Sequence, residues 1–327
     1  MSHYSPVVAA LITMLLTIII LISKFGKEIQ DVPNERSLHE TPIPRIGGVA
    51  MMAGILSGWA LMLTSLAWWL VLPLIGLFVV SLLDDMHSLP VRKRLLAQLI
   101  AAAVLVAGSG LLTQQGLLIT LLVLLLTVWM TNLYNFMDGS DGLAGGMALF
   151  GFSFYGIAAL MGENDTFAML NFTIGAAALG FLYNNFYPAK VFMGDAGSIP
   201  LGFLAAGMGL WGWQQGYWPA WFPILVFSPF IVDASVTLVK RTLRGEKITE
   251  AHREHYYQRA IQMGWGHRNV AFVEYSLMLA AGAVGLQCIQ PDWAWYFPLG
   301  LFGIYSILML LLDFRWKKQQ AKLDTIE

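Results

Sequence analysis

Charged residues are scarce in this sequence: 20 acidic and 19 basic residues make up only 12% of the 327-residue chain. An ordinary soluble domain contains about 25%. Apolar residues account for 57% of the chain, and runs of bilayer-spanning length, roughly 17–25 residues, recur along it. This composition excludes a soluble globular protein and predicts an all-α, polytopic membrane protein whose partner is the lipid bilayer. The formal net charge of −1 gives no reason to expect a nucleic-acid partner.

Cysteine is almost absent. Cys288 stands alone in the chain, which excludes an intramolecular disulfide framework and leaves the redox compartment open. The first long apolar run, residues 7–23, has no basic segment before it and no small-residue cleavage site before Lys24. These features predict a retained first membrane helix rather than a cleaved signal peptide.

Apolar runs separated by polar connections predict about eleven transmembrane helices. Most runs are close to the length that a helix needs to cross the hydrocarbon core. No internal repeat and no linker divides them, so we predict a single membrane domain over residues 1–327. The predicted helices are 5–23, 47–65, 67–83, 95–112, 117–134, 143–161, 166–185, 199–213, 219–239, 270–288 and 293–312.

Lys and Arg separate completely between two sets of connections. One set contains all 19 of these residues, and the alternate set contains none. Because cytoplasmic loops carry the excess of Lys and Arg, the first set is predicted to be cytoplasmic, with the N-terminus outside and the C-terminus inside. Tryptophans gather in the alternate set, as expected at the outer interface. The predicted cytoplasmic segments are about 24–46, 84–94, 135–142, 186–198 and 240–269, together with the tail from 313.

Five acids lie at predicted cytoplasmic helix ends: Asp84, Asp85, Asp138, Asp141 and Asp195. Any one of them could be an interfacial residue or a helix cap. An ionisable group within a membrane span is costly, by several kcal/mol, unless it faces a cavity, a partner or a metal. Five carboxylates at one membrane face, three of them beside glycines, therefore indicate a functional site.

The glycines lie in the segments "DGSDGLAGG" and "GDAGS". They permit positive φ and a close approach of backbone amides, and the helix N-termini that they open favour phosphate. Carboxylate oxygens suit Mg²⁺, which commonly binds through one or two carboxylates plus substrate phosphates. Basic residues lie at the same face, at 92–94 and along 240–259. This combination predicts a phosphate-transfer site for a membrane-embedded substrate, although an anion transporter would need some of the same parts.

Histidines offer a weaker signal. His252 and His255 have the spacing of one helical face, but no third nitrogen or sulfur ligand lies nearby in the sequence, which disfavours zinc. Contact with phosphate or sugar and a solvated loop position both stay open for this pair, as for His39. We expect no role for His3, His87 and His267.

Four ordered blocks resemble the polyprenyl-phosphate N-acetylhexosamine-1-phosphate transferases of glycosyltransferase family 4. This superfamily includes the phospho-MurNAc-pentapeptide translocase and the undecaprenyl-phosphate GlcNAc-1-phosphate transferase. The blocks are "NERSLHETPIPRIGG", "DDMHSLPVRKRLLAQ", "NLYNFMDGSDGLAGG" and "FLYNNFYPAKVFMGDAGS". The family's last block, often His-x-His-His, is "AHREHYYQRA" here. This departure resembles the branch that starts O-antigen and other surface polysaccharides, and it leaves the sugar open.

The resemblance implies a reaction in which undecaprenyl phosphate attacks the β-phosphate of a UDP-N-acetylhexosamine or a 6-deoxy relative of that sugar nucleotide. The products would be an undecaprenyl-diphosphate-sugar and UMP, at the start of lipopolysaccharide O-antigen or a related polysaccharide. It further implies Mg²⁺, with Mn²⁺ as a substitute, an active site on the cytoplasmic face of the bacterial inner membrane, and a homodimer.

The resemblance also implies roles for individual residues. Asp195 is the expected main Mg²⁺ ligand, with Asp138 and Asp84 as further metal ligands. Asp84 and Asp85 are catalytic candidates that place the lipid phosphate or accept its proton. The second role is weak, because a phosphate monoester with a pKa of about 6 is already mostly ionised near neutral pH. The expected nucleotide, phosphate and sugar contacts are Asn132, Asn135, Asp138, Asp141, Asn185, Arg92, Arg94, His252, Arg253 and His255.

Two other functions use some of the same features. An anion transporter could use Asp233, which lies about two turns inside the membrane, as its proton site, but transporters place such groups along a path near the midplane. Here the charged residues gather at one face. A non-catalytic scaffold for polysaccharide assembly would have little use for both the acids and the glycine-rich segments. We therefore expect an enzyme.

Overall fold

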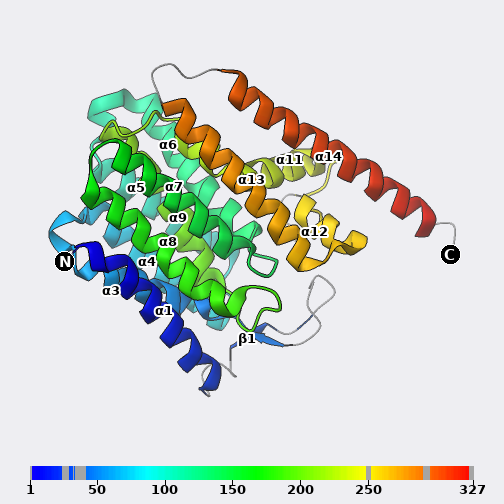
Figure 1. Cartoon of the computed structure of the whole chain (residues 1–327), viewed down its shortest axis with the longest axis horizontal. Helices are drawn as coiled ribbons and strands as arrows, with labels where there is room; N and C mark the ends of the chain where they lie inside the picture. The colour runs from blue at the N-terminus through cyan, green and yellow to red at the C-terminus, as the bar shows by residue number, and fades with distance from the viewer. Residues whose placement is uncertain are drawn as a thin grey trace.

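The computed structural model describes residues 2–23, 29–31, 33, 42–247, 252–289 and 295–323. His39 and much of the predicted loop 24–46 lie outside these ranges. The described chain is a bundle of helices with one small two-stranded sheet (Figure 1). Its elements are η1 (Ser2–Tyr4), α1 (Ser5–Ile22), β1 (Gln30–Asp31), β2 (Ile43–Pro44), α3 (Gly47–Ala60), η2 (Leu63–Ser65), α4 (Trp68–His87), α5 (Val91–Gly108), α6 (Leu111–Phe136), α7 (Leu143–Met161), α8 (Asp165–Asn185), α9 (Asp195–Gln214), α10 (Phe222–Val226), α11 (Ser228–Leu243), α12 (Tyr256–Ala260), η3 (Ile261–Trp265), α13 (Gly266–Ile289) and α14 (Tyr296–Leu323).

The prediction of an all-α, polytopic membrane protein is confirmed. Among the described residues, 7 helical stretches are long and apolar enough to cross a bilayer. The number of eleven crossings and the orientation of the chain stay predictions. The seven stretches are Ser2–Ile22, Trp68–His87, Leu111–Phe136, Leu143–Met161, Asp165–Asn185, Tyr256–Ile289 and Tyr296–Lys322.

Three helix boundaries differ from the prediction in ways that matter for function. The predicted helix 219–239 is two helices, α10 and α11, and Pro229 lies in the first turn of the second, where its missing N–H costs no hydrogen bond. The helix expected from 199 begins earlier, at Asp195, which places that acid in the first turn of α9. The helix expected to end at 312 continues through Leu323.

Small residues hold the bundle together closely. In lipid, helices gain nothing by hiding apolar surface from the tails, so association depends on close packing and hydrogen bonds. A Cβ on Gly180 of α8 would lie 2.4 Å from the Ala10 carbonyl oxygen of α1. The Ser5 hydroxyl of α1 donates to the Gly58 carbonyl of α3 over 2.6 Å and lies 2.8 Å from the Thr173 hydroxyl of α8. These contacts join α1, α3 and α8 into one unit.

Helix α9 lies in the middle of the bundle, packed against α4 and α6 (Figure 1). Its glycines permit this position: a Cβ on Gly202 would lie 2.8 Å from the Met130 carbonyl oxygen and the Thr131 Cα of α6. Because α9 is held from several sides, its first residue, Asp195, has a defined position at one end of the bundle.

The segment that follows β2 lies directly against the start of α9. β2 pairs antiparallel with β1, with Pro44 opposite Gln30. The Gly47 and Gly48 N–H groups donate to the carbonyls of Phe192 and Met193 over 2.9 and 2.8 Å. The structure therefore brings the "PRIGG" and "FMGDAGS" segments, about 150 residues apart in the sequence, into backbone contact.

Gly48→Ala should destabilise the protein. The new Cβ would lie 2.3 Å from the Gly197 nitrogen and 2.5 Å from its Cα, so α3 and α9 would have to separate, at a cost of about 1–3 kcal/mol. Gly76→Ala is the matched control, because nothing lies within 4 Å of a Cβ at that position, and it should be neutral or stabilising by up to about 1 kcal/mol. Thermal unfolding of the purified variants in detergent measures the difference; equal melting temperatures would contradict the packing argument.

Candidate active site

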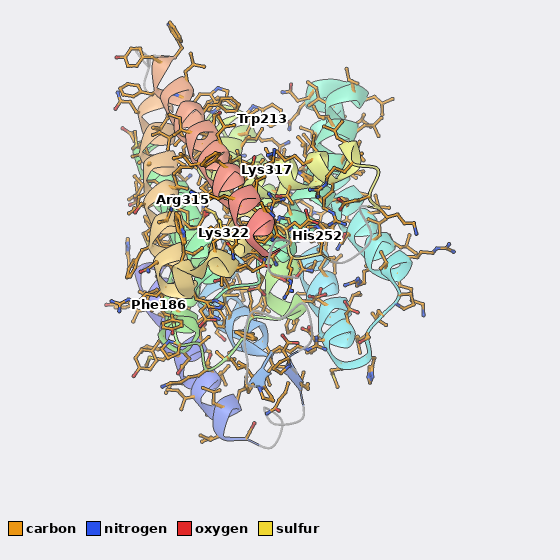
Figure 2. All side chains as sticks on the ribbon, turned by 90° about the vertical axis from the view of Figure 1, so that its right-hand side faces the viewer. Phe186, Trp213, His252, Arg315, Lys317 and Lys322 are labelled. Carbon is orange, nitrogen blue, oxygen red and sulfur yellow. The ribbon has the colours of Figure 1, made fainter. Side chains whose placement is uncertain are left out.

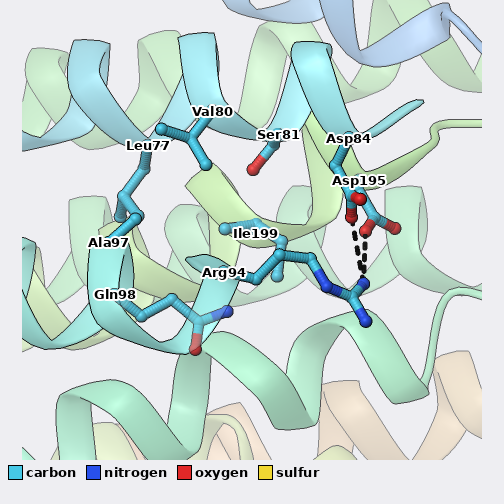
Figure 3. Close-up of a pocket in the computed structure, with 9 residues that line it drawn as sticks. All are labelled: Leu77, Val80, Ser81, Asp84, Arg94, Ala97, Gln98, Asp195 and Ile199. Atoms are coloured by element: carbon cyan, nitrogen blue, oxygen red, sulfur yellow. Dashed lines mark hydrogen bonds and ion pairs between the residues drawn. The ribbon is translucent and has the colours of Figure 1, made fainter. Parts of the chain in front are cut away.

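Two acids and one arginine from three helices meet at one end of the bundle. Asp84 lies in the last turn of α4, Arg94 in the first turn of α5 and Asp195 at the start of α9. The Arg94 Nη1 lies 3.0 Å from Asp84 Oδ2 and 3.3 Å from Asp195 Oδ2 (Figure 3). One guanidinium nitrogen therefore bridges two carboxylates that would otherwise repel each other.

The turn between α4 and α5 sets the position of Asp84. Ser88 ends α4 with φ 51°, and its N–H donates to the Asp84 carbonyl over 2.8 Å. The Leu89 N–H donates to Asp84 Oδ1 over 2.6 Å. One oxygen of this carboxylate thus holds the turn, and the other faces Arg94.

Asp85 has a different role from its neighbour. Its two carboxylate oxygens accept the N–H groups of Asp195 and Ala196 over 3.1 and 2.9 Å, so it caps the N-terminus of α9. The N–H groups of the next two residues, 197 and 198, donate to the Gly194 carbonyl. At this helix terminus, which the sequence suggested for a phosphate, the protein's own Asp85 carboxylate and the Gly194 carbonyl accept the first N–H groups.

Gly194 and Arg45 complete this cap. Gly194 has φ 72°, and a Cβ there would lie 2.3 Å from the Arg45 carbonyl oxygen and 2.8 Å from Asp85 Oδ2. The Arg45 Nη2 donates to the Asp85 carbonyl over 2.8 Å. Sequence reasoning assigned no role to Arg45, although it lies in the quoted "PIPRIGG" segment; its signal was a lone base in a segment rich in Pro and Gly.

Asp138 lies in the loop after α6 and is half-buried. Burial raises the pKa of its carboxyl from 3.8 to about 8, and the negative charges of Asp195, Asp85 and Asp31 raise it further in that direction. The Asp138 carboxyl therefore lies in a largely desolvated position, close enough to Asp195 and Asp85 to be affected by their charges.

The asparagines of α6 connect it to its neighbours. Asn135 accepts a hydrogen bond from the Ser198 hydroxyl of α9 over 2.6 Å. The Asn132 amide donates to Gln98 Oε1 of α5 over 2.6 Å and to the Val128 carbonyl over 2.8 Å. Both predicted residues thus lie beside the helices that carry the acids. Ser198 and Gln98 were not predicted.

Asn185 and Asp141 hold two loops together. Asn185 accepts from the Gly142 N–H over 3.1 Å and donates to the Val191 carbonyl over 2.9 Å. Asp141 accepts from the Ala189 N–H over 2.9 Å. Both side chains are buried and connect the loops 137–142 and 186–194.

His267, for which we expected no role, belongs to the same region. Its Nδ1 lies 3.0 Å from the Ser140 hydroxyl and 3.7 Å from Asp141 Oδ1.

Of the predicted bases that begin α5, only Arg94 contacts the acids within the described structure. Arg92 is exposed at the surface.

The predicted pair His252 and His255 does not lie on one helical face. His255 is the N-cap of α12, and His252 precedes it, although their ring centroids are 4.9 Å apart. His252 is half-buried, and burial, followed by the nearby His255 and Arg241, lowers its pKa to about 4. Arg253 is exposed, whereas His255 is buried. Of the three, His252 and Arg253 are the residues that a soluble ligand can reach.

Asp233 binds the start of α12. Its carboxylate oxygens accept the N–H groups of Tyr256 and Tyr257 over 2.8 and 3.0 Å, and Oδ1 lies 3.4 Å from His255 Nδ1. This acid, predicted from the sequence to lie inside the membrane, fixes a short helix, which gives no support to a proton site for transport.

Tyr257 places α12 against the loop of Asp138. Its hydroxyl donates to the Phe136 carbonyl over 3.2 Å, and a Cβ on Gly139 would lie 2.2 Å from that hydroxyl. The His255 ring stacks on Phe136 at 6.2 Å between centroids. Helix α12 and the residue before it therefore pack against the loop 137–142, which contains Asp138.

A small cavity lies between α4, α5 and α9 (Figure 3). Asp84, Arg94 and Asp195 line its polar end. The remaining lining consists of Leu77, Val80, Ser81, Ala97, Gln98 and Ile199.

This lining follows helical spacing. On α4 the lining residues lie at 77, 80, 81 and 84, and on α5 at 94, 97 and 98, which is the spacing of one helical face. This spacing can be read from the sequence, but only the packing of the three helices shows that these residues line the same cavity. The cavity joins an apolar wall to a charged end.

Among the described residues, no group of three His, Cys, Asp or Glu side chains is placed to hold a metal ion by itself. Asp84 and Asp195 offer hard oxygen atoms on one side of Arg94. A pair of carboxylates suits Mg²⁺ when substrate phosphates supply the other ligands. The donor set therefore fits a metal that binds together with a phosphate substrate.

Comparison with known proteins points to the part of the chain that contains these acids and Arg94. The family model described as "Glycosyl transferase family 4" matches residues 67–212, which include Asp84, Arg94, Asp138 and Asp195. The C-terminal loop with His252 lies outside the match.

Similar proteins match over most of the chain. A Bacillus subtilis (strain 168) protein named "Probable undecaprenyl-phosphate N-acetylglucosaminyl 1-phosphate transferase" is 30% identical, over 93% of this chain and 90% of its own. A "Decaprenyl-phosphate N-acetylglucosaminephosphotransferase" of Mycobacterium tuberculosis is 30% identical, over 85% of this chain and 81% of its own.

A "Phospho-N-acetylmuramoyl-pentapeptide-transferase" of Pelotomaculum thermopropionicum is 32% identical, over 55% of this chain and 64% of its own. The family match covers the acids and the Arg94 bridge, and the similarity to the Bacillus protein covers nearly the whole of both chains. On these grounds the chain belongs to glycosyl transferase family 4.

Proposed function

We propose that this protein transfers a sugar 1-phosphate from a UDP-N-acetylhexosamine to undecaprenyl phosphate, giving undecaprenyl-diphosphate-sugar and UMP. The single observation that carries the proposal is the cavity with an apolar wall and the Asp84–Arg94–Asp195 cluster at its end. The Bacillus and Mycobacterium relatives are named as transferases that act on a polyprenyl phosphate and an N-acetylglucosamine phosphate, which supports the same chemistry.

The two parts of the cavity suit the two parts of a polyprenyl phosphate. The apolar lining residues, Leu77, Val80, Ala97 and Ile199, would contact the isoprenoid unit next to the head group. Moving apolar groups of this kind out of water is favourable. Arg94 would donate hydrogen bonds to the phosphate, because its guanidinium is permanently charged and matches phosphate oxygens. A nucleotide has no apolar tail, so the apolar lining favours the lipid as the occupant of the cavity.

Mg²⁺ is the proposed metal, held by Asp195 and Asp84. Asp138, which lies close enough to Asp195 and Asp85 to be affected by their charges, is the proposed further ligand. When bound, the ion would act as a Lewis acid and offset the negative charge that develops during phosphoryl transfer. Mn²⁺, which prefers the same oxygen ligands, is proposed as a substitute.

In the proposed reaction, a lipid phosphate oxygen attacks the β-phosphorus of the UDP-sugar. A new phosphorus–oxygen bond forms, the bond to the UMP oxygen breaks, and UMP leaves with that electron pair. No strong base is needed, because a phosphate monoester is already mostly ionised near neutral pH. Asp85, whose oxygens hold the start of α9, therefore acts as a positioning residue, and Asp84 and Asp195 face the reacting groups.

The soluble nucleotide sugar would meet the loop 252–255. His252 is neutral near pH 7, because its pKa is lowered to about 4, so it would contact the substrate as a neutral hydrogen-bonding group, and Arg253 would supply the charge. We propose a cytoplasmic active face in the bacterial inner membrane, since all 19 Lys and Arg lie in one set of connections. The product would start O-antigen or a related surface polysaccharide.

The purified protein in detergent, with Mg²⁺, undecaprenyl phosphate and UDP-GlcNAc, should release UMP, and EDTA should stop the release. Asp195→Asn removes the charge that faces Arg94 and should lower turnover at least about 100-fold. A UMP assay over a panel of UDP-N-acetylhexosamines, including 6-deoxy sugars, identifies the donor. No release with any donor would contradict the function, and normal turnover by Asp195→Asn would contradict the metal assignment.

Asp85→Asn should destabilise the protein, unlike Asp195→Asn. Asparagine keeps one acceptor for the two N–H groups at the start of α9, and a lost cap costs about 0.5–2 kcal/mol. In the described structure no N–H group of the backbone donates to the Asp195 carboxylate, so its replacement should keep the melting temperature. Thermal unfolding of both variants separates a positioning acid from a reacting one; equal melting temperatures would remove the distinction.

Ala97→Phe should weaken binding of the lipid. The ring would fill the apolar part of the cavity, so we expect the KM for undecaprenyl phosphate to rise about tenfold or more, with the KM for UDP-GlcNAc unchanged. Leu96→Phe is the matched control, because Leu96 is 58% exposed on α5 and does not line the cavity. A KM for lipid that stays at the wild-type value in Ala97→Phe would show that the chain binds elsewhere.

A further inference from the structure

The long C-terminal helix α14 lies along the outside of the bundle (Figure 1). Most of its large apolar side chains are exposed, and the small buried cluster that it forms contains Leu301 and Tyr305 against Ala281 of α13. In lipid such a helix gains no hydrophobic free energy from docking, so its position depends on polar contacts. One of these is the pair of hydroxyls of Tyr305 and Ser228, 2.7 Å apart.

The second polar contact is centred on Asp313. Its carboxylate pairs with the Lys240 ammonium of α11. It also accepts from the Tyr256 hydroxyl over 3.2 Å and from the Arg259 Nη1 over 3.2 Å. A single acid of α14 therefore joins α11 and α12.

Arg259 has two ion-pair partners in the described structure, and one of them, Asp313, lies on α14. This arginine is buried, and its other nitrogen, Nη2, lies 3.3 Å from Glu254 Oε2. Its guanidinium lies 5.3 Å from the Tyr256 ring centroid and 5.8 Å from that of Trp316. Because a buried charge is stable only when it is paired, removal of Asp313 would leave Arg259 short of a partner.

Helix α12 transmits this contact to the site. The residue before it, His255, packs on Phe136, and Tyr257 of α12 donates to the carbonyl of Phe136. Phe136 immediately precedes the loop of Asp138. A displacement of α12 would therefore move His252 and Arg253 and disturb the Asp138 loop, but it would leave the Asp84–Arg94 pair in place.

We propose that Asp313 is a positioning residue: it latches α14 onto α12 and so holds the loop 252–255 where the nucleotide sugar binds. The inference rests on the proposed function for its substrate. The latch lies outside the matched region 67–212. Figure 2 faces this end of α14 and labels its bases Arg315, Lys317 and Lys322, together with His252 of the loop.

The kinetic test uses the full-length protein with UDP-GlcNAc and undecaprenyl phosphate. Asp313→Asn should raise the KM for UDP-GlcNAc about tenfold and leave the KM for lipid near the wild-type value, because the Asp84–Arg94 pair stays in place. Asp313→Glu should restore most of the affinity. Lys317→Gln, an exposed position on the same helix, is the matched control and should behave as wild type. Equal KM values in Asp313→Asn and wild type would overturn the proposal.

A second measurement does not depend on activity. Ala260 of α12 is 4% exposed, so in a Cys288→Ser background an Ala260→Cys thiol should react slowly with a maleimide. Asp313→Asn should speed this labelling at least about tenfold if α12 loosens, and Lys317→Gln should not. Unchanged labelling would overturn the latch. If wild type releases no UMP but labelling still accelerates, the proposed function falls and the latch stands.

Trp316→Leu guards against a variant that does not fold. It removes the ring beside Arg259 but keeps all charges, so it should give a smaller change, about two- to threefold in KM and in labelling rate. Size-exclusion profiles of the purified variants show which of them are folded. The role of α14 would be contradicted if folded Trp316→Leu kept the wild-type KM for UDP-GlcNAc and the wild-type labelling rate, and folded Asp313→Asn also kept the wild-type KM.

Discussion

The bridge of Arg94 between Asp84 and Asp195 is the interaction on which the site depends. Two carboxylates held close together in a low dielectric repel each other strongly, and the guanidinium offsets that repulsion. The arrangement needs three helices, since α4, α5 and α9 contribute one residue each. The same helices also form an apolar wall beside the charges, so the proposed lipid substrate would meet one continuous surface.

Two buried acids, Asp85 and Asp233, fix the helix starts that carry or adjoin predicted site residues. Asp85 accepts both first N–H groups of α9, and Asp233 does the same for α12. Near a bilayer little water is available to satisfy the free N–H groups of a helix start, so a carboxylate from a neighbouring helix is an effective cap. Each cap also joins two helices, which places Asp195 in one case and the loop 252–255 in the other.

Family similarity and physical contact cover different parts of the chain. The matched region 67–212 holds the acids and Arg94, whereas the loop that would meet the nucleotide sugar lies after it. That loop is held by α11, α12 and α14 through Glu254, Arg259 and Asp313. We infer that the phosphate chemistry belongs to the bundle core and that the peripheral C-terminal helix contributes to binding of the soluble substrate.

Hydropathy, the distribution of Lys and Arg, and the ordered acidic blocks were enough to predict an all-α membrane protein and the acids that meet at its end, because these features are local in the sequence. The sequence alone did not separate Asp84 from Asp85: adjacent residues on a helix point about 100° apart, and only the position of α9 shows that one faces Arg94 and the other caps a helix. The roles of Arg45, Asp233 and Asp313 were likewise decided by tertiary structure, because each acts on an element that is distant in the chain.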